Sequence, residues 1–279
     1  MILFLLKVIR NSAIYPYWIY FNKCWKDNEF LLPYISGNVI EVGCGSGQLK
    51  EFVLKNKGAN IYHATDYYDP HKSSHYEMNK YEDLSKKYFF NLSKIKEIFV
   101  GKSVDYSFID FPADCRNLEM VQNSTYDTYI ASEVFEHVYE IDSVFKEAHR
   151  ILRDGGNLIF TVPFFYQVHG PLLKNSLDGQ FIQDFNRFTA AKIHLDLTSI
   201  GFQRVAIFTN VSFFIALTQL INSLFLRKFY QLNKITKALI LPILPIAFAL
   251  VNLSCLLLDA IVGHDENYPG RYNFIYKKL

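Results

Sequence analysis

The chain has 279 residues, is half hydrophobic, and carries 29 basic against 27 acidic side chains, which gives a formal net charge of +2. This length suffices for one sizeable domain plus an extra element, and the charge balance gives no global field that would favour a nucleic-acid partner. The four cysteines lie far apart and show no metal-ligand spacing with histidine, so we expect reduced structural thiols in a cytosolic compartment and no metal site.

The first 32 residues form an apolar and aromatic segment that we expect to be helical. Its six apolar starting residues end at Lys7, and it lacks the long apolar run and small-residue cleavage site of a secretory signal. Aromatic side chains then gather at Tyr15, Tyr17, Trp18, Tyr20 and Phe21. Such residues suit either a membrane interface or a helix packed on a core, and the sequence leaves both interpretations open.

Residues 33–210 alternate short apolar runs with longer helical patterns. Strands are predicted at residues 39–42, 61–65, 103–111, 126–131, 157–162 and 204–209, and helices at residues 47–57, 141–152 and 189–200. The last of these helices stops at Gly201, a residue type that commonly ends helices. Strands that alternate with helices predict an α/β fold, in which a parallel sheet is covered by helices on both faces.

The pattern changes after residue 210. Residues 211–226 are a largely apolar run of helical length, and residues 238–262 carry a single charge, that of Asp259. A turn-like stretch at residues 264–270 leads to a last predicted strand at residues 272–276. The sequence therefore predicts an apolar helical insert at residues 211–263, followed by a final strand of the core within residues 264–279.

A glycine-rich turn at residues 41–47, Glu-Val-Gly-Cys-Gly-Ser-Gly, closes the first predicted strand and opens the first predicted helix. Glycines let the backbone turn sharply and approach a ligand, and a helix N-terminus offers free N–H groups. A dinucleotide fingerprint would need its third glycine at position 48, which is Gln48, so an NAD site is disfavoured. Asp66, at the end of the second predicted strand, is placed to accept hydrogen bonds from two ribose hydroxyls, or else is a turn or cap residue.

Four motifs in chain order resemble the class I S-adenosylmethionine (SAM)-dependent methyltransferases, and in particular their type 11 branch, many of whose members are associated with bacterial cell-surface glycan synthesis. They are residues 41–47 with Asp66, residues 114–118, residues 126–138 and the turn at residues 153–156. The resemblance implies SAM as cofactor and a Rossmann-like, seven-stranded, mostly parallel sheet.

The same resemblance implies which residues bind the cofactor. It assigns the adenine to Asp114, although Phe111 and Pro112 crowd the end of the third predicted strand and leave Asp110 as the alternative. His137 is expected near the sulfonium, or else caps a helix or lies in the core. The full implied cofactor-binding set is Glu41, Gly43, Cys44, Gly45, Gly47, Asp66, Tyr67, Asp114, Cys115, Glu133 and His137.

Candidate acceptor residues follow the fifth predicted strand, whose carboxyl end faces the binding crevice in folds of this kind. The sulfonium is already electrophilic, so the protein must mainly align the acceptor, and an oxygen acceptor must also lose a proton. His169 is the candidate general base, or else a hydrogen-bonded loop histidine. Asp184 and Arg187 are candidate acceptor ligands, or else an ion pair that pins the loop before Thr189. Tyr166 is a candidate wall of the acceptor pocket, or else packs in the core.

The insert bears on where such an enzyme works. Residues 238–262 are long enough to cross a bilayer, but one crossing would separate two strands that are antiparallel neighbours in the resembling fold. We expect Pro242 and Pro245 to break or kink this helix. Two crossings would carry four cations to the far side, against the positive-inside bias: Arg227, Lys228, Lys234 and Lys237. We therefore expect helices that lie in the membrane surface, with a soluble cap or dimer interface as the alternative.

Taken together, these features predict a SAM-dependent methyltransferase on the cytoplasmic membrane face. We expect it to methylate an oxygen of a small-molecule or lipid-linked acceptor, such as a sugar on a lipid carrier. A quinone or prenyl-phenol acceptor is the alternative within the same chemistry. A non-catalytic, membrane-bound scaffold that retains the fold is the alternative outside it.

Overall fold

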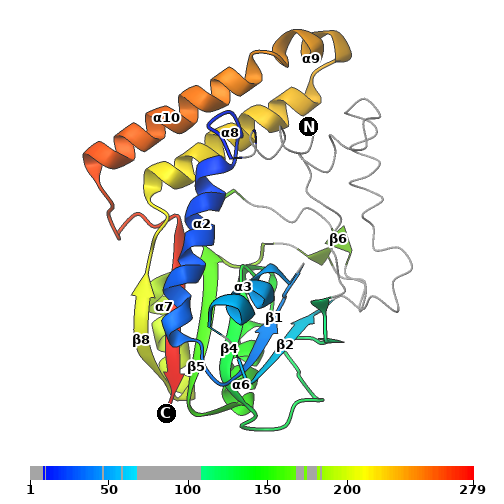
Figure 1. Cartoon of the computed structure of the whole chain (residues 1–279), viewed down its shortest axis with the longest axis vertical. Helices are drawn as coiled ribbons and strands as arrows, with labels where there is room; N and C mark the ends of the chain where they lie inside the picture. The colour runs from blue at the N-terminus through cyan, green and yellow to red at the C-terminus, as the bar shows by residue number, and fades with distance from the viewer. Residues whose placement is uncertain are drawn as a thin grey trace.

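The computed structural model describes residue 9 and residues 11–45, 47–57, 59–67, 108–167, 173–174, 181–182 and 184–279. Its main sheet has the strand order β3-β2-β1-β4-β5-β9-β8 (Figure 1). The strands are β1 (Asn38–Val42), β2 (Ile61–Asp66), β3 (Phe111–Pro112), β4 (Tyr126–Ser132), β5 (Leu152–Pro163), β8 (Phe202–Phe208) and β9 (Arg271–Lys278). Only β9 among these runs antiparallel to its neighbours, so the expected seven-stranded, mostly parallel sheet is confirmed.

Helices cover both faces of this sheet, because successive residues of a strand point to opposite sides. Tyr129 belongs to one buried cluster and its neighbour Ile130 to the other. The first cluster is covered by α6 (Ile141–Ile151) and α7 (Ala190–Ile200), and the second by α3 (Gln48–Asn56) and the short turn η1 (Leu32–Tyr34). A second short turn, η3 (Phe135–His137), follows β4, and β6 (Leu173–Lys174) pairs with β7 (Phe181–Ile182) apart from the main sheet.

The predicted third strand is the element that differs most from the structure. Its residues 103–107 lie outside the described residues, and β3 comprises only Phe111 and Pro112, paired with Thr65 and Asp66. A proline has no backbone N–H with which to continue a ladder, so a short edge strand is what the sequence allows here. The chain then turns at residues 113–118, beyond the end of the strand.

A helical layer lies at the carboxyl edge of the parallel strands (Figure 1). It consists of α8 (Phe213–Gln231), α9 (Lys234–Ile240) and α10 (Leu244–Val262), and α2 (Trp18–Leu31) runs from this layer down along the sheet, where Leu31 joins the core (Figure 1). The chain enters α8 just after β8 and returns from α10 to the start of β9, so both connections lie on the edge where β1 and β4 also end. The predicted run 238–262 is broken between α9 and α10, at Pro242 and Pro245, where missing N–H groups interrupt helical hydrogen bonding.

Candidate active site

The glycine turn joins β1 to α3 through left-handed backbone conformations. Gly45 has φ +52° and Gly47 has φ +68°, values that side-chain-bearing residues rarely adopt. A Cβ atom on Gly47 would lie 2.4 Å from Cβ of Phe108, whereas a Cβ on Gly45 would meet nothing within 4 Å. Gly47 is therefore required for packing, and the backbone of Gly45 is open to an approaching ligand.

Asp66 lies against this turn at the end of β2. Its Oδ2 accepts a hydrogen bond from the backbone N–H of Gly45 at 2.9 Å, and the N–H of Cys44 donates to the carbonyl of Thr65 at 3.0 Å. These bonds fix the distance between the first two strand ends. They place the carboxylate of Asp66 at the carboxyl edge of the sheet, where the sequence predicted a ribose ligand.

Glu41 is a buried carboxyl beside the same turn. The hydroxyl of Tyr62 donates to its Oε2 at 2.8 Å, which favours the charged form. Burial, to which the charge of Asp66 adds, nevertheless raises the pKa of Glu41 to about 8. Glu41 is therefore mainly protonated at neutral pH and brings little negative charge to the cavity that it lines.

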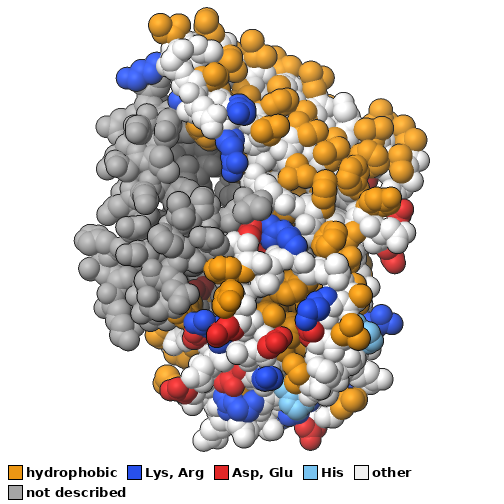
Figure 2. All heavy atoms as spheres, turned by 180° about the vertical axis from the view of Figure 1, so that it is seen from behind, with side chains coloured by type: hydrophobic (Ala, Val, Ile, Leu, Met, Phe, Trp, Pro, Cys, Tyr) orange, Lys and Arg blue, Asp and Glu red, His pale blue; other side chains and the backbone are white. Residues whose placement is uncertain are grey.

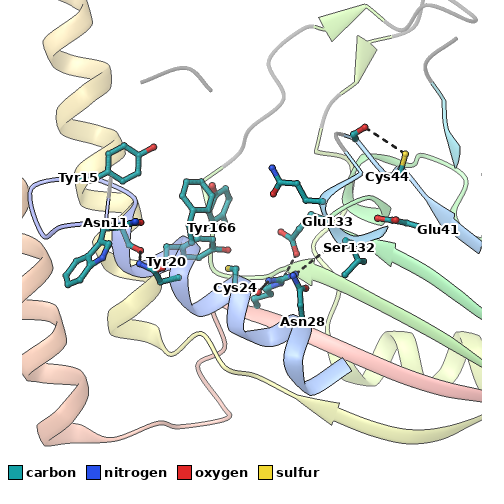
Figure 3. A pocket seen from close by; sticks show the side chains of 18 residues that line it. Asn11, Tyr15, Tyr20, Cys24, Asn28, Glu41, Cys44, Ser132, Glu133 and Tyr166 are labelled. Carbon is teal, nitrogen blue, oxygen red and sulfur yellow. Dashed lines mark hydrogen bonds and ion pairs between the residues drawn. The ribbon is translucent and has the colours of Figure 1, made fainter. Parts of the chain in front are cut away.

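A cavity of about 970 Å³ begins at this turn and runs to the N-terminal segment. Figure 3 shows Glu41 and Cys44 on one side, Glu133 and Ser132 in the middle, and a group of aromatic side chains on the other side. Six residues predicted for the cofactor or acceptor line it together: Glu41, Gly43, Cys44, Gly45, Glu133 and Tyr166. The structure thus joins the end of β1, the end of β4 and the segment after β5 in one space.

The middle of the cavity contains an ion pair. Arg271, at the start of β9, places its Nε 2.9 Å from Oε1 of Glu133 and donates from a terminal nitrogen to Oγ1 of Thr161 at 2.6 Å. Glu133 has φ +56°, a left-handed conformation that costs about 1–3 kcal/mol for a residue other than glycine. Surrounding contacts must hold this conformation, and the ion pair with the buried Arg271 is one of them.

The aromatic end of the cavity comes from α2, the turn before it, and the segment after β5. Tyr15, Trp18, Tyr20 and Phe21 line it together with Tyr166, whose ring centroid lies 5.0 Å from that of Tyr20. Within the described part of the chain, the buried hydroxyl of Tyr20 has no hydrogen-bond partner. The only sequence signal for this segment was its aromatic composition, and Arg271 had no signal at all. Both reach the site through contacts between residues that are far apart in the sequence.

A second group of predicted residues lies beyond β3. Asp114 forms an ion pair with Arg116 at 2.7 Å, and the guanidinium of Arg116 lies 6.0 Å from the ring centre of Tyr67. Burial raises the pKa of the adjacent Cys115 to about 12, so this thiol is protonated. Asp110 lies before β3, where its carboxylate accepts from the backbone N–H of Ala64 at 2.6 Å and from Lys50 at 2.7 Å.

A third group consists of His137, Asp184 and Arg187, and none of these three is among the lining residues of the cavity. Arg187 donates to Oδ2 of Asp184 at 2.6 Å, and Nδ1 of His137 lies 3.2 Å from Oδ1 of Asp184. Asn186 donates to the carbonyls of Phe135 and Val138, which ties the same loop to η3. This arrangement corresponds to the structural alternative, an ion pair that pins the loop before α7.

Glu136 lies behind this group and is fully buried. Neither carboxyl oxygen has a hydrogen-bond partner among the described residues, although Nε2 of His137 is 3.7 Å from Oε1. Burial and the nearby charge of Glu133 raise the pKa of Glu136 well above its ordinary value. Glu136 is therefore a neutral acid in the interior.

His169, the candidate base, lies outside the described residues.

Comparison with known families gives one match that covers most of the chain: a model described as a methyltransferase domain matches residues 22–207. No curated protein matches the chain. Among solved structures, a SAM-dependent methyltransferase from Mesorhizobium loti is 14% identical, with 92% of this chain and 98% of that chain covered and a TM-score of 0.48.

Two further solved structures are similar at the same level. A SAM-dependent methyltransferase from Archaeoglobus fulgidus is 14% identical, covering 91% of this chain and 94% of its own, with a TM-score of 0.47. Phosphoethanolamine N-methyltransferase 2 from Haemonchus contortus, in complex with SAM, is 15% identical, covering 98% of this chain and 60% of its own, with a TM-score of 0.48.

Proposed function

The chain belongs to the methyltransferase-domain family and is a SAM-dependent methyltransferase, and we propose that it methylates a hydroxyl group of a lipid-linked acceptor at a membrane surface. The observation that carries this proposal is the single cavity that joins the glycine turn to the aromatic end. Ligand sites commonly span roughly 300–1,000 Å³, so a cavity of about 970 Å³ is large enough for a cofactor and part of an acceptor.

The glycine-turn end of the cavity is the cofactor half in this proposal. Asp66 would accept from the ribose hydroxyls, and the open backbone at Gly45 would approach the methionyl part of SAM. Asp114 is our candidate for the adenine because it follows the carboxyl end of β3, whereas Asp110 precedes β3; both carboxylates already accept hydrogen bonds, Asp114 from Arg116 and Asp110 from Lys50 and Ala64. Tyr67, Cys115 and His137 remain predicted cofactor contacts.

The charges of the cavity favour an uncharged acceptor group. Glu41 is mainly protonated at neutral pH, and Glu133 is compensated by Arg271. The described lining therefore offers neither a free carboxylate for an ammonium acceptor nor a free cation for an anionic one. A hydroxyl enters such a site without leaving a buried charge unpaired, and the Tyr20 hydroxyl, which has no hydrogen-bond partner among the described residues, is our candidate to bind it.

An oxygen acceptor also needs a base, and His169 stays our prediction for that role. Replacing His169 with Asn should lower turnover by about 10²–10⁴-fold, the usual contribution of a general base. A loss of less than about tenfold would show that another group accepts the proton. SAM affinity measured on the same variant separates a chemical defect from a defect in cofactor binding.

The helical layer supports a membrane location. One helix of the described chain, α10, is long and apolar enough to cross a membrane, with a mean hydropathy of 2.1 and 17% of that window buried. Figure 2 shows hydrophobic side chains gathered over this layer. The exposed stripe of α10, which we call the apolar stripe, contains Ile246, Leu250, Leu253, Leu257 and Ile261.

The topology favours a helix that lies in the membrane surface over one that crosses it. β8 precedes α8, β9 follows α10, and the two strands are antiparallel partners in one sheet, so both must lie on the same side of the bilayer. The exposed cations Arg227, Lys228 and Lys234 belong to the α8–α9 end of the layer, where they would meet anionic headgroups of the cytoplasmic leaflet.

A second acceptor class is favoured by the aromatic end of the cavity. The rings of Trp18, Tyr20 and Tyr166 would flank a quinol or prenyl-phenol as readily as they would stack on a sugar. Both acceptors present a neutral hydroxyl and carry a lipid tail. The identity of the methylated product therefore separates them, and the geometry of the cavity alone does not.

The membrane part of the proposal is tested by cosedimentation with vesicles of equimolar phosphatidylcholine and phosphatidylglycerol. We expect the wild-type protein to sediment with the vesicles, and the double variant Leu250→Asp/Leu257→Asp to stay in the supernatant, because it places two carboxylates in the apolar stripe. Leu54→Asp changes a comparably exposed leucine on α3 and serves as the matched control. Wild-type protein that stays soluble would refute the membrane location, whereas SAM titration calorimetry tests the cofactor half independently.

A further inference from the structure

In the contact between α8 and α10, polar side chains are buried, whereas the exposed side of α10 is apolar. Two amide side chains, Asn222 on α8 and Asn252 on α10, are fully buried against each other and the N-terminal segment, while the apolar stripe of α10 is exposed. A buried amide costs free energy unless it is hydrogen-bonded, so the partners of these amides identify what this contact holds in place.

These two amides hold a single turn of the N-terminal segment. Nδ2 of Asn252 donates to the carbonyl of Ala13 at 2.7 Å and to that of Tyr15 at 3.0 Å. Nδ2 of Asn222 donates to the carbonyl of Pro16 at 2.8 Å and to Oδ1 of Asn252 at 2.9 Å. Asn222 and Asn252 thus form an amide pair that satisfies three carbonyls more than 200 residues away in sequence.

The turn held by the amide pair is followed by the residues that form the aromatic end of the cavity, which is the acceptor half in our proposal. Tyr15 lies within it, and Trp18 and Tyr20 follow at the start of α2; all three line the cavity. Tyr20 also packs in a small buried cluster with Val211 and Ile215, next to α8. This cluster is separate from the two clusters that cover the sheet. The aromatic wall, which we define as Tyr15, Trp18 and Tyr20, therefore depends on α8 for part of its position.

We propose that Asn222 and Asn252 are positioning residues, which couple the seating of α10 on a membrane surface to the position of the aromatic wall of the cavity. The inference rests on the membrane location proposed above. Asn252 lies on one side of α10 and the apolar stripe on the other, so one rigid helix contacts both the bilayer and the pocket wall. Docking of the stripe then biases where residues 13–18 lie, and a lipid-linked acceptor meets an ordered wall at the membrane.

The coupling is measured with Trp18 as the reporter. The chain has two tryptophans, so a Trp25→Phe background leaves Trp18 as the only one. We expect the emission of Trp18 to shift when vesicles of equimolar phosphatidylcholine and phosphatidylglycerol are added. In Asn252→Ala, and in Asn222→Ala as the second variant, we expect vesicle binding to persist and the Trp18 shift to be lost.

Two readouts distinguish positioning from a general loss of structure. SAM affinity of both variants should stay within about twofold of the parent, since the glycine turn shares no partner with the amide pair. Asn267→Ala is the matched control, because the Asn267 side chain donates only to Asp265 in an exposed turn and should keep the full shift.

The outcomes separate the two proposals. If the parent protein cosediments with vesicles but its Trp18 emission does not shift, the coupling is wrong and the membrane location stands. The same conclusion follows if the amide variants keep the full shift. Parent protein that does not cosediment overturns the membrane location and the coupling together. Loss of the shift in either folded amide variant, with vesicle binding and SAM affinity retained, supports the coupling.

Discussion

The two halves of the cavity are built in different ways. The cofactor half consists of the turn residues Glu41, Gly43, Cys44 and Gly45, with Asp66 hydrogen-bonded to Gly45 beside them, and adjacent parallel strands bring these residues together. The acceptor half consists of the lining residues between Asn11 and Asn28 together with Tyr166 and Arg271, which meet through contacts that span up to 247 positions. Strand ladders position the first half, and a helical layer with buried amides positions the second.

This difference teaches where each kind of substitution should act. Changes in the cofactor half should alter SAM affinity or the stability of the sheet, because its residues belong to the core ladder. Changes in the aromatic side chains of the acceptor half should leave both nearly unchanged and alter only acceptor use or the membrane response, whereas Arg271 also stabilises the left-handed Glu133. Substitutions at Asp66, Gly47, Glu41 and Tyr20 test that separation.

Replacing Asp66 with Ala should weaken SAM binding by about 10²- to 10⁴-fold. Hydrogen bonds to a charged group contribute about 1.5–3 kcal/mol each, and this carboxylate is proposed to hold two ribose hydroxyls. Titration calorimetry measures the effect. Asp154→Ala, which removes an exposed carboxylate paired with Lys278, is the control and should bind SAM normally. A loss of less than about fivefold in Asp66→Ala would exclude Asp66 as the ribose ligand.

Replacing Gly47 with Ala should lower the free energy of unfolding by about 2–3 kcal/mol, because it combines an unfavourable φ with overpacking against Phe108. Gly45→Ala meets open space and should cost only about 1–2 kcal/mol for its left-handed conformation. Gly45→Ala should weaken SAM binding more than Gly47→Ala does, since Gly45 lines the cavity. Denaturant unfolding measures the stability of both variants, and titration calorimetry measures their SAM affinity. Equal losses of stability and of SAM affinity in the two variants would contradict this prediction.

The buried Glu41 should make stability depend on pH. Its pKa rises from 4.5 to about 8 on folding, so the folded state binds the proton more tightly. The free energy of unfolding should therefore fall as the pH rises from 4.5 towards 8, by roughly 4 kcal/mol for this group. Glu41→Gln should remove that slope when denaturant unfolding is measured across the range. An unchanged slope would mean that other groups cause it.

Replacing Tyr20 with Phe should raise the half-saturating acceptor concentration about fivefold, the loss expected for one neutral hydrogen bond. Stability should be unchanged or higher, because the hydroxyl has no partner in the described structure. Tyr129→Phe is the matched control, since the buried Tyr129 hydroxyl likewise has no hydrogen-bond partner among the described residues but lies in the sheet core. An equal effect in both variants would show that Tyr20 does not contact the acceptor.

The same contrast explains what the sequence could predict. The turn after residue 41 and the helix end at Gly201 follow from local backbone rules, so most strands of the main sheet and α7 were predictable, whereas β3 is shorter than predicted. The prolines at 242 and 245 likewise marked the break between α9 and α10.

The acceptor half could not be predicted in the same way. Arg271 resembles any basic residue at the start of a strand, and its pairing with Glu133 exists only after β9 inserts beside β5. Asn222 and Asn252 read as polar interruptions in apolar helices until the fold places them against Ala13, Tyr15 and Pro16. Such contacts depend on tertiary packing, which no local pattern encodes.

The central claim, methyl transfer to a hydroxyl of a lipid-linked acceptor, is tested most directly with methyl-labelled SAM. The purified protein is incubated with labelled SAM and a membrane lipid extract, and the labelled product is identified by mass spectrometry. We predict label in a lipid-soluble product as a methyl ether on a sugar or phenolic oxygen. Label found only in water-soluble or nitrogen-methylated products, or no transfer by protein that binds SAM, would contradict the account.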